Sequence, residues 1–191
     1  AKLSAHRRLR LMHAQLKAQA AAIERSNGHL LQEQEVAKAV FDRVIHTGAL
    51  RAPNVRYLLS PLAVFNGDVL LSAFNPAGGM HLLLADFTGH GLPAAIGAIP
   101  LAETFYSMTR KGFQIEEILA EANAKLGQVL PVGIFSCVAA ATMDFRKAEL
   151  RVWQGGLPDC LLYRSRERRC EVVRSRHLPL GILPRERFNA E

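Results

Sequence analysis

Residues 82–95, LLLADFTGHGLPAA, constrain the fold more than any other part of this 191-residue chain. An unbroken apolar run ends in Asp86, a Gly-His-Gly turn follows, and Pro93 opens an alanine-rich segment. A short apolar run bounded by turn residues is typical of a buried strand, and proline is favoured in the first turn of a helix. The stretch therefore predicts a strand buried on both faces, a tight turn and a helix, with a carboxylate where the strand ends.

The same reasoning extends to the rest of the chain after residue 54. Apolar runs predict strands at 55–65, 68–74 and 80–86, with a hairpin turn at Asn66-Gly67 between the first two. Helical patterns cover 92–111, stopped by Gly112 and with an internal proline expected to kink it, and 115–131. Residues 135–174 read as a meander of strands. This order predicts an α+β fold with helices packed outside the sheet structure.

The first 45 residues carry a seven-residue repeat and contain no proline and one glycine. The repeat positions are Leu9, Leu16, Ile23, Leu30, Ala37 and Val44. Such a repeat is typical of a coiled coil, although the companion positions three residues on are polar in the middle. We expect a dimerising linker helix over residues 1–48 and a separate domain over 49–191. The alternative is a single amphipathic helix lying on the globular body.

Composition narrows the class of protein. No apolar run is long enough for a membrane helix and no secretory signal is visible, so we expect a cytoplasmic protein that does not bind membranes. Three cysteines without metal-ligand spacing indicate reduced thiols: Cys137, Cys160 and Cys170. Because the chain starts at Ala1 rather than Met, we expect it to be a processed chain or a fragment of something longer.

The net charge of +7 is concentrated towards the two ends of the chain. Six arginines form a basic hairpin region: residues 164, 166, 168, 169, 174 and 176. Since no aromatic residues are interleaved to stack on bases, we do not expect nucleic-acid binding. A solvated turn and a docking surface for an acidic partner both remain open.

A carboxylate that ends a buried strand is costly unless it meets a cation. The turn at Asn66-Gly67 is followed by Asp68, which would supply a second carboxylate at a neighbouring strand. Magnesium and manganese ions prefer oxygen ligands of this kind. A zinc site is disfavoured because His81 and His90 have no cysteine partner and no helical pairing, and a Ser/His/Asp triad lacks its nucleophile elbow.

Taken together, these residues resemble one family. Residues 82–95 look like the Asp-x-Ser/Thr-Gly-His-Gly-x-x-Ala-Ala signature of bacterial metal-dependent (PPM-type) serine/threonine phosphatases of the SpoIIE and RsbU kind. Weaker features on both sides of this stretch occur in the same order as in the family. Among them are the Gly67-Asp68 pair, Asn123 with Leu126, and residues 179–181, Pro-Leu-Gly. The similarity runs from about residue 55 to the end of the chain.

The resemblance implies an αββα sandwich of two antiparallel sheets flanked by helices, with two divalent cations, Mn²⁺ or Mg²⁺, at one edge. Asp68 and Asp86 would be metal ligands, with the Phe87 carbonyl as a third. His90 would be a nearby catalytic acid, or else a turn residue that caps the helix. The two ions would activate water, so that no side-chain nucleophile is required.

Two functions follow from the resemblance. The first is a phosphatase output domain of a response regulator, with a receiver domain before the linker, that dephosphorylates a phosphoprotein such as an anti-anti-sigma regulator. The second is a pseudophosphatase adaptor that binds a sigma factor or anti-sigma partner without catalysis. The chain departs from the family at Asn66 and at residues 69–71, and the family's last acidic motifs normally lie beyond the Pro-Leu-Gly segment, so we expect the domain to be C-terminally incomplete.

Overall fold

The computed structural model describes residues 2–45, 48–59, 67–89 and 91–190. The chain divides into two compact units, Ala1–Val40 and Phe41–Glu191. The first unit is part of one continuous helix, α1 (Lys2–Ile45), built largely from alanine, leucine, glutamine and charged residues that favour helices. The last turn of α1 belongs to the second unit, where Phe41 and Ile45 are buried in the core. None of the helices in these described ranges is both long and apolar enough to cross a membrane.

The second unit is built on a four-stranded antiparallel sheet in the order β1-β2-β3-β4. These strands are β1 (Asp68–Phe74), β2 (Met80–Phe87), β3 (Ser136–Asp144) and β4 (Glu149–Gly155). Alternate side chains of the central strand β2 are buried on one face of the sheet, as the period of a strand requires: His81, Leu83, Ala85 and Phe87.

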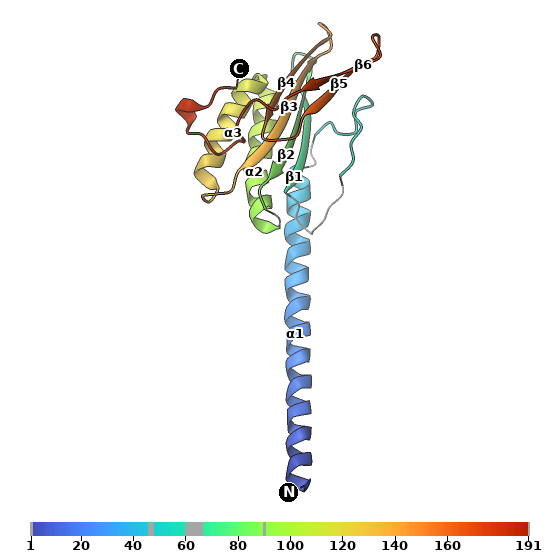
Figure 1. Ribbon diagram of the computed structural model, residues 1–191, viewed down its shortest axis with the longest axis vertical. Coiled ribbons are helices and arrows are strands. Elements are labelled where there is room, and N and C mark those ends of the chain that lie inside the picture. The colour runs from blue at the N-terminus through green and yellow to red at the C-terminus, as the bar shows by residue number, and fades with distance from the viewer. Residues whose placement is uncertain (1, 46–47, 60–66, 90, 191) are drawn as a thin grey trace. The chain divides into compact units, whose positions relative to one another are not determined.

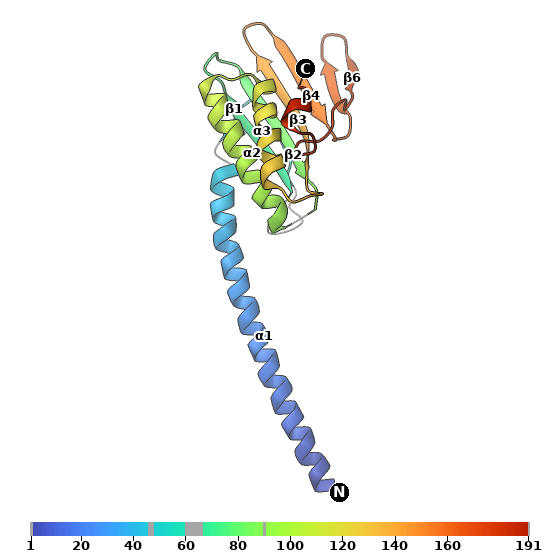
Figure 2. The same cartoon turned by 90° about the vertical axis from the view of Figure 1, so that its left-hand side faces the viewer.

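Two helices cover that face, lying side by side (Figure 1, Figure 2). Helix α2 (Leu92–Lys111) has a proline in its first turn and ends at Gly112, which adopts a left-handed conformation with φ 85° and donates its N–H to the last carbonyls. Helix α3 (Ile115–Val129) begins where the Glu117 carboxylate accepts the Gln114 N–H at 2.9 Å. Both helices agree with the sequence-based expectation, as does the stop of α2 at Gly112, and α3 ends two residues earlier than expected.

The second sheet is a two-stranded hairpin of β5 (Cys160–Arg164) and β6 (Arg169–Val173), beside β4 in Figure 2. The segment after β6 returns to the main sheet, where the N–H groups of Arg176 and His177 donate to the Gln154 carbonyl, both at 3.2 Å. A short 3₁₀ helix (Arg185–Arg187) follows. The expected meander of strands over residues 135–174 is therefore present, but its last two strands leave the main sheet.

Two expectations from the sequence are wrong. Residues 55–59 form no strand, whereas the rest of that predicted strand and Asn66 of the predicted hairpin turn lie outside the described residues. A turn that joins β1 to β2 lies at 75–79, where the Asn75 side chain accepts the Gly79 N–H at 2.9 Å. Strand β2 is not buried on both faces, because Leu84 and Asp86 are exposed on the face opposite the helices.

Candidate metal centre

Asp68 and Asp86 face each other across the first two strands of the sheet. Asp68 begins β1, and the antiparallel register pairs it directly with Asp86 near the end of β2. Directly opposed residues of an antiparallel pair have Cβ atoms about 4.5–5.5 Å apart, on the same face of the sheet. Both residues are exposed, on the face that the helices do not cover. The fold therefore brings the two predicted carboxylates together.

The electrostatics of this pair are unfavourable without a cation. Partial burial, and then the neighbouring Asp68 carboxylate, raise the pKa of Asp86 above its usual value. Within the described ranges, no ion pair is present for either aspartate. Two like charges opposite each other therefore add to the cost of partial burial that we expected for a carboxylate at the end of a strand. A divalent cation between them would offset that repulsion.

Phe87 could contribute only its main chain to the candidate metal site, because its side chain points away from the two aspartates. Its side chain is buried beneath α2, where a Cβ added to Gly97 would lie 2.6 Å from the ring. Its N–H donates to the Gly67 carbonyl at 3.1 Å, and a Cβ on Gly67 would lie 2.8 Å from the Phe87 oxygen. Position 67 therefore requires glycine, because any side chain there would collide with the Phe87 carbonyl. The resemblance implies this carbonyl as a third metal ligand.

The turn between β2 and α2 is held by Thr88. The Thr88 N–H donates to the Phe135 carbonyl at 3.0 Å, and the Thr88 hydroxyl accepts the Phe135 N–H at 3.1 Å. Gly89 and Gly91 both have positive φ, at 85° and 78°, which glycine adopts without strain. Gly91 is the N-cap of α2 and offers no side chain, so Thr88 does not cap the helix. His90, the predicted catalytic acid, lies outside the described residues.

Cys137 completes a row of polar side chains that the sequence analysis missed. The register places it on β3 directly opposite Asp86, so that Asp68, Asp86 and Cys137 follow one another across three strands. Burial, and then the Asp86 carboxylate, raise the pKa of the Cys137 thiol. The strand pairing that creates this row has no local signal in the sequence.

The residues present suit one divalent ion better than two. Two carboxylates supply two negative charges, against the four positive charges of two ions, and the Phe87 carbonyl adds an oxygen without charge. Among the residues the structure describes, no group of three or more His, Cys, Asp and Glu side chains could hold a metal ion. The ligands are therefore oxygen atoms, which suit a hard cation, but they are too few for a centre with two ions.

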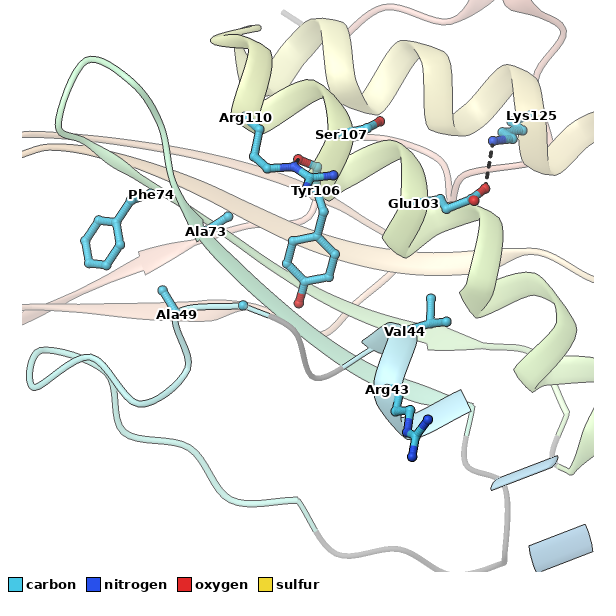
Figure 3. A pocket seen from close by; sticks show the side chains of 11 residues that line it. Arg43, Val44, Ala49, Ala73, Phe74, Glu103, Tyr106, Ser107, Arg110 and Lys125 are labelled. Atoms are coloured by element: carbon cyan, nitrogen blue, oxygen red, sulfur yellow. Dashed lines mark hydrogen bonds and ion pairs between the residues drawn. The ribbon is translucent and has the colours of Figure 1, made fainter. Parts of the chain in front are cut away.

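A pocket in the second unit lies away from the two aspartates. Its volume is about 870 Å³, and Figure 3 shows it between the last turn of α1, the end of β1 and helix α2. Strand β1 contributes Ala73 and Phe74, at the opposite end from Asp68. Three of its polar side chains are already engaged: the Tyr106 hydroxyl donates to the Ile45 carbonyl at 2.8 Å, and Lys125 pairs with Glu103 at 3.5 Å. The pocket is therefore separate from the aspartate pair.

The fold is similar to two solved structures. The chain superposes on the SiaA-PP2C domain of Pseudomonas aeruginosa with a TM-score of 0.68 and 16% sequence identity, over 83% of this chain and 65% of that one. It also matches the RsbU and RsbW domains of Rv1364c from Mycobacterium tuberculosis with a TM-score of 0.54 and 23% identity, over 65% and 34% of the two chains. The fold is thus that of a PP2C-type phosphatase domain, and this chain spans less than two thirds of the length of either structure.

The family follows from the sequence. Residues 76–191 match the family described as Stage II sporulation protein E (SpoIIE), and the chain belongs to that family. The matched segment contains Asp86 and Phe87 and begins after Asp68. No curated protein matches the chain significantly. The resemblance drawn from residues 82–95 is confirmed, as is an α+β fold with two antiparallel sheets and a long N-terminal helix.

Proposed function

We propose that this chain is a metal-dependent protein serine/threonine phosphatase domain, the output domain of a bacterial response regulator acting in the cytoplasm. Its substrate would be a phosphoprotein such as an anti-anti-sigma regulator. The observation that carries the proposal is the direct pairing of Asp68 with Asp86 on an exposed face, within a fold of the PP2C type. A pair of like charges in register lowers stability, so it is best explained by a cation that the pair binds.

Each residue of the site has a distinct role in this proposal. Asp68 and Asp86 would bind Mn²⁺ or Mg²⁺, and the Phe87 carbonyl would complete the set of protein oxygens. Bound divalent ions supply an activated water and neutralise charge on the phosphate ester. The uncapped N–H groups at the start of α2 favour an anion nearby, and His90 would protonate the leaving oxygen.

A second function, a pseudophosphatase adaptor, is favoured by the small number of carboxylates. Only two of them meet at the site within the described ranges, which is few for a two-ion centre. Such an adaptor would bind a sigma or anti-sigma factor through the same fold without turnover. Under either function, we propose that α1 joins the domain to a receiver domain and forms a homodimer.

Mn²⁺-dependent hydrolysis of an aryl phosphate separates the two functions. We expect Asp86→Asn and Asp68→Asn each to reduce the rate by at least about a hundredfold, because each removes a charged metal ligand. Asp159→Asn is a matched control, since this exposed carboxylate lies just before β5 and outside the pair. Activity that survives both substitutions and excess chelator would contradict the phosphatase proposal. A wild type that binds a sigma factor and shows no metal-dependent turnover would establish the adaptor.

A further inference from the structure

The β5–β6 hairpin has an exposed apolar face. The register pairs Leu161 with Val172 and Tyr163 with Cys170, so these four side chains lie on one face of the two-stranded sheet. Leu161, Tyr163 and Val172 are 70%, 60% and 55% exposed. The alternate residues Leu162 and Val173 are half-buried. The hairpin thus turns one face towards the rest of the domain and the other face away from it.

The exposed face continues beyond the end of β6. Ser175 points towards the body, because its hydroxyl accepts the Gly156 N–H at 2.9 Å. His177 also points inwards, where its ring stacks on Trp153 with centroids 4.9 Å apart. Arg174 and Arg176 alternate with these residues and are exposed. In this extended segment they therefore lie on the same side as Val172.

Arg174 and Arg176 differ in their pairing from Arg164 and Arg169, the arginines of the two strands. Arg164 binds the Glu171 carboxylate at 2.8 Å, and Arg169 binds both Glu171 and Glu167. For Arg174 and Arg176 no ion pair is present among the residues described. We call Leu161, Tyr163, Val172, Arg174 and Arg176 the outer hairpin face. It combines apolar area with positive charge that none of the described side chains neutralises.

We propose that the outer hairpin face is a docking surface for an acidic protein segment that carries apolar side chains between its carboxylates. Arginine and tyrosine, together with tryptophan, are enriched among the interface residues that contribute most of the binding energy. Guanidinium groups bind carboxylates through two parallel hydrogen bonds, and Leu161 and Val172 would be buried against the partner's apolar side chains. The binding needs neither metal nor turnover, so it does not rest on the proposed catalytic function.

Charge argues against the other occupants. A second copy of this chain would bring its own Arg174 and Arg176 against the same residues, which like-charge repulsion disfavours. A further strand of the same domain would bury both guanidinium groups without partners, at a large cost in desolvation. Nucleic acid would use the arginines, but Tyr163 is the only aromatic side chain on the face that could stack on a base.

The test is a binding titration by fluorescence anisotropy with the full chain. The probe is a labelled synthetic peptide in which glutamates flank a leucine and phenylalanine core, compared with the same peptide carrying glutamines and with a single-stranded DNA oligonucleotide. We expect the glutamate peptide to bind more than about tenfold tighter than either. Binding that does not distinguish glutamate from glutamine would overturn the proposal, and preferential DNA binding would assign the face to nucleic acid instead.

Variants locate the surface. The double charge reversal Arg174→Glu with Arg176→Glu should weaken peptide binding by more than about tenfold, and Tyr163→Ser should weaken it by a similar factor. Arg51→Glu with Arg146→Glu makes the same change in net charge at two exposed positions outside the hairpin and should have less than about a threefold effect. If the charge reversal unfolds the hairpin, the double variant Arg174→Gln with Arg176→Gln replaces it in the same titration, because it removes both charges without adding new ones. Equal losses in the hairpin pair and in the matched pair would overturn the proposal, as would a loss of self-association in the hairpin pair alone.

Discussion

At the scale of single residues, the aspartate pair is the feature with the clearest physical consequence. An isolated exposed aspartate costs little, whereas two directly opposed across a strand pair repel each other. The raised pKa of Asp86 has burial as its first cause and Asp68 as its second, which agrees with this repulsion. The chain therefore keeps a destabilising arrangement at the point where its family signature lies.

Replacement of one aspartate should stabilise the protein when no metal is present. We expect Asp86→Asn to raise the free energy of unfolding by about 0.5 kcal/mol in excess chelator, because it removes one of two opposed charges. Urea unfolding at neutral pH measures the difference. Asp159→Asn should leave it unchanged.

The same substitution should have the opposite effect with metal present. Saturating Mn²⁺ binds the folded wild type and stabilises it by mass action, and Asp86→Asn should lose most of that gain. An equal gain in wild type and variant would place the bound ion elsewhere.

At the scale of elements, α1 is the helix whose apolar side chains are most exposed to solvent. A single helix by itself leaves its apolar side chains in water, and Leu16, Ile23 and Leu30 recur every seven residues along α1. Such a repeat forms a continuous seam that a second helix can cover. A homodimer through this seam stays a prediction.

Charges placed in the seam should separate the dimer. We expect the double variant Leu16→Asp with Ile23→Asp to be monomeric at micromolar concentration, because each aspartate would face its copy across the seam. Light scattering measures the mass. Leu11→Asp with Leu31→Asp is a matched control, since these exposed leucines lie off the seven-residue repeat and should leave the dimer intact. A monomeric wild type would refute the dimer, and an unchanged mass in the seam variant would place the interface elsewhere.

At the scale of the whole molecule, the described residues cover the second face of the four-stranded sheet only in part, where Met80 and Gln154 are buried. Phe74, Leu84, Leu150 and Val152 are exposed on it, opposite the face covered by α2 and α3. In the αββα sandwich that the resemblance implies, a second sheet covers this face, and here the second sheet has two strands. The chain also spans 65% of the SiaA-PP2C chain. The aspartate pair lies on the exposed part of this face.

The number of metal ions follows from the charges available on that face. We expect calorimetric titration of this chain with Mn²⁺ to detect one weakly bound ion, because two carboxylates balance one divalent cation and not two. Asp86→Asn should abolish the binding heat, and Asp159→Asn should leave it unchanged. Two tightly bound ions per chain would show that other residues complete the site.

The sequence by itself determined the elements whose signals are local. Helix α2 has its proline at the start and Gly112 at its end, and strand β1 begins at Asp68 as the apolar pattern predicts. The family was also readable from one stretch, because its glycines and proline are required by local backbone geometry and the carboxylate stands at a fixed spacing before them. These features depend only on residues that are close together in the sequence, and for this reason the sequence alone was enough to predict them.

Only the tertiary structure decided which residues meet. The pairing of Asp68 with Asp86, the position of Cys137 beside them and the absence of a strand at 55–59 all depend on strand register and on the order of strands in the sheet. Register is set by the burial of one face against helices that are distant in sequence, and a shift of one residue would move every side chain to the other face. The outer hairpin face has the same origin, because Ser175 and His177 turn inwards through contacts with β4 and the residue after it, and Arg174 and Arg176 are thereby left facing outwards.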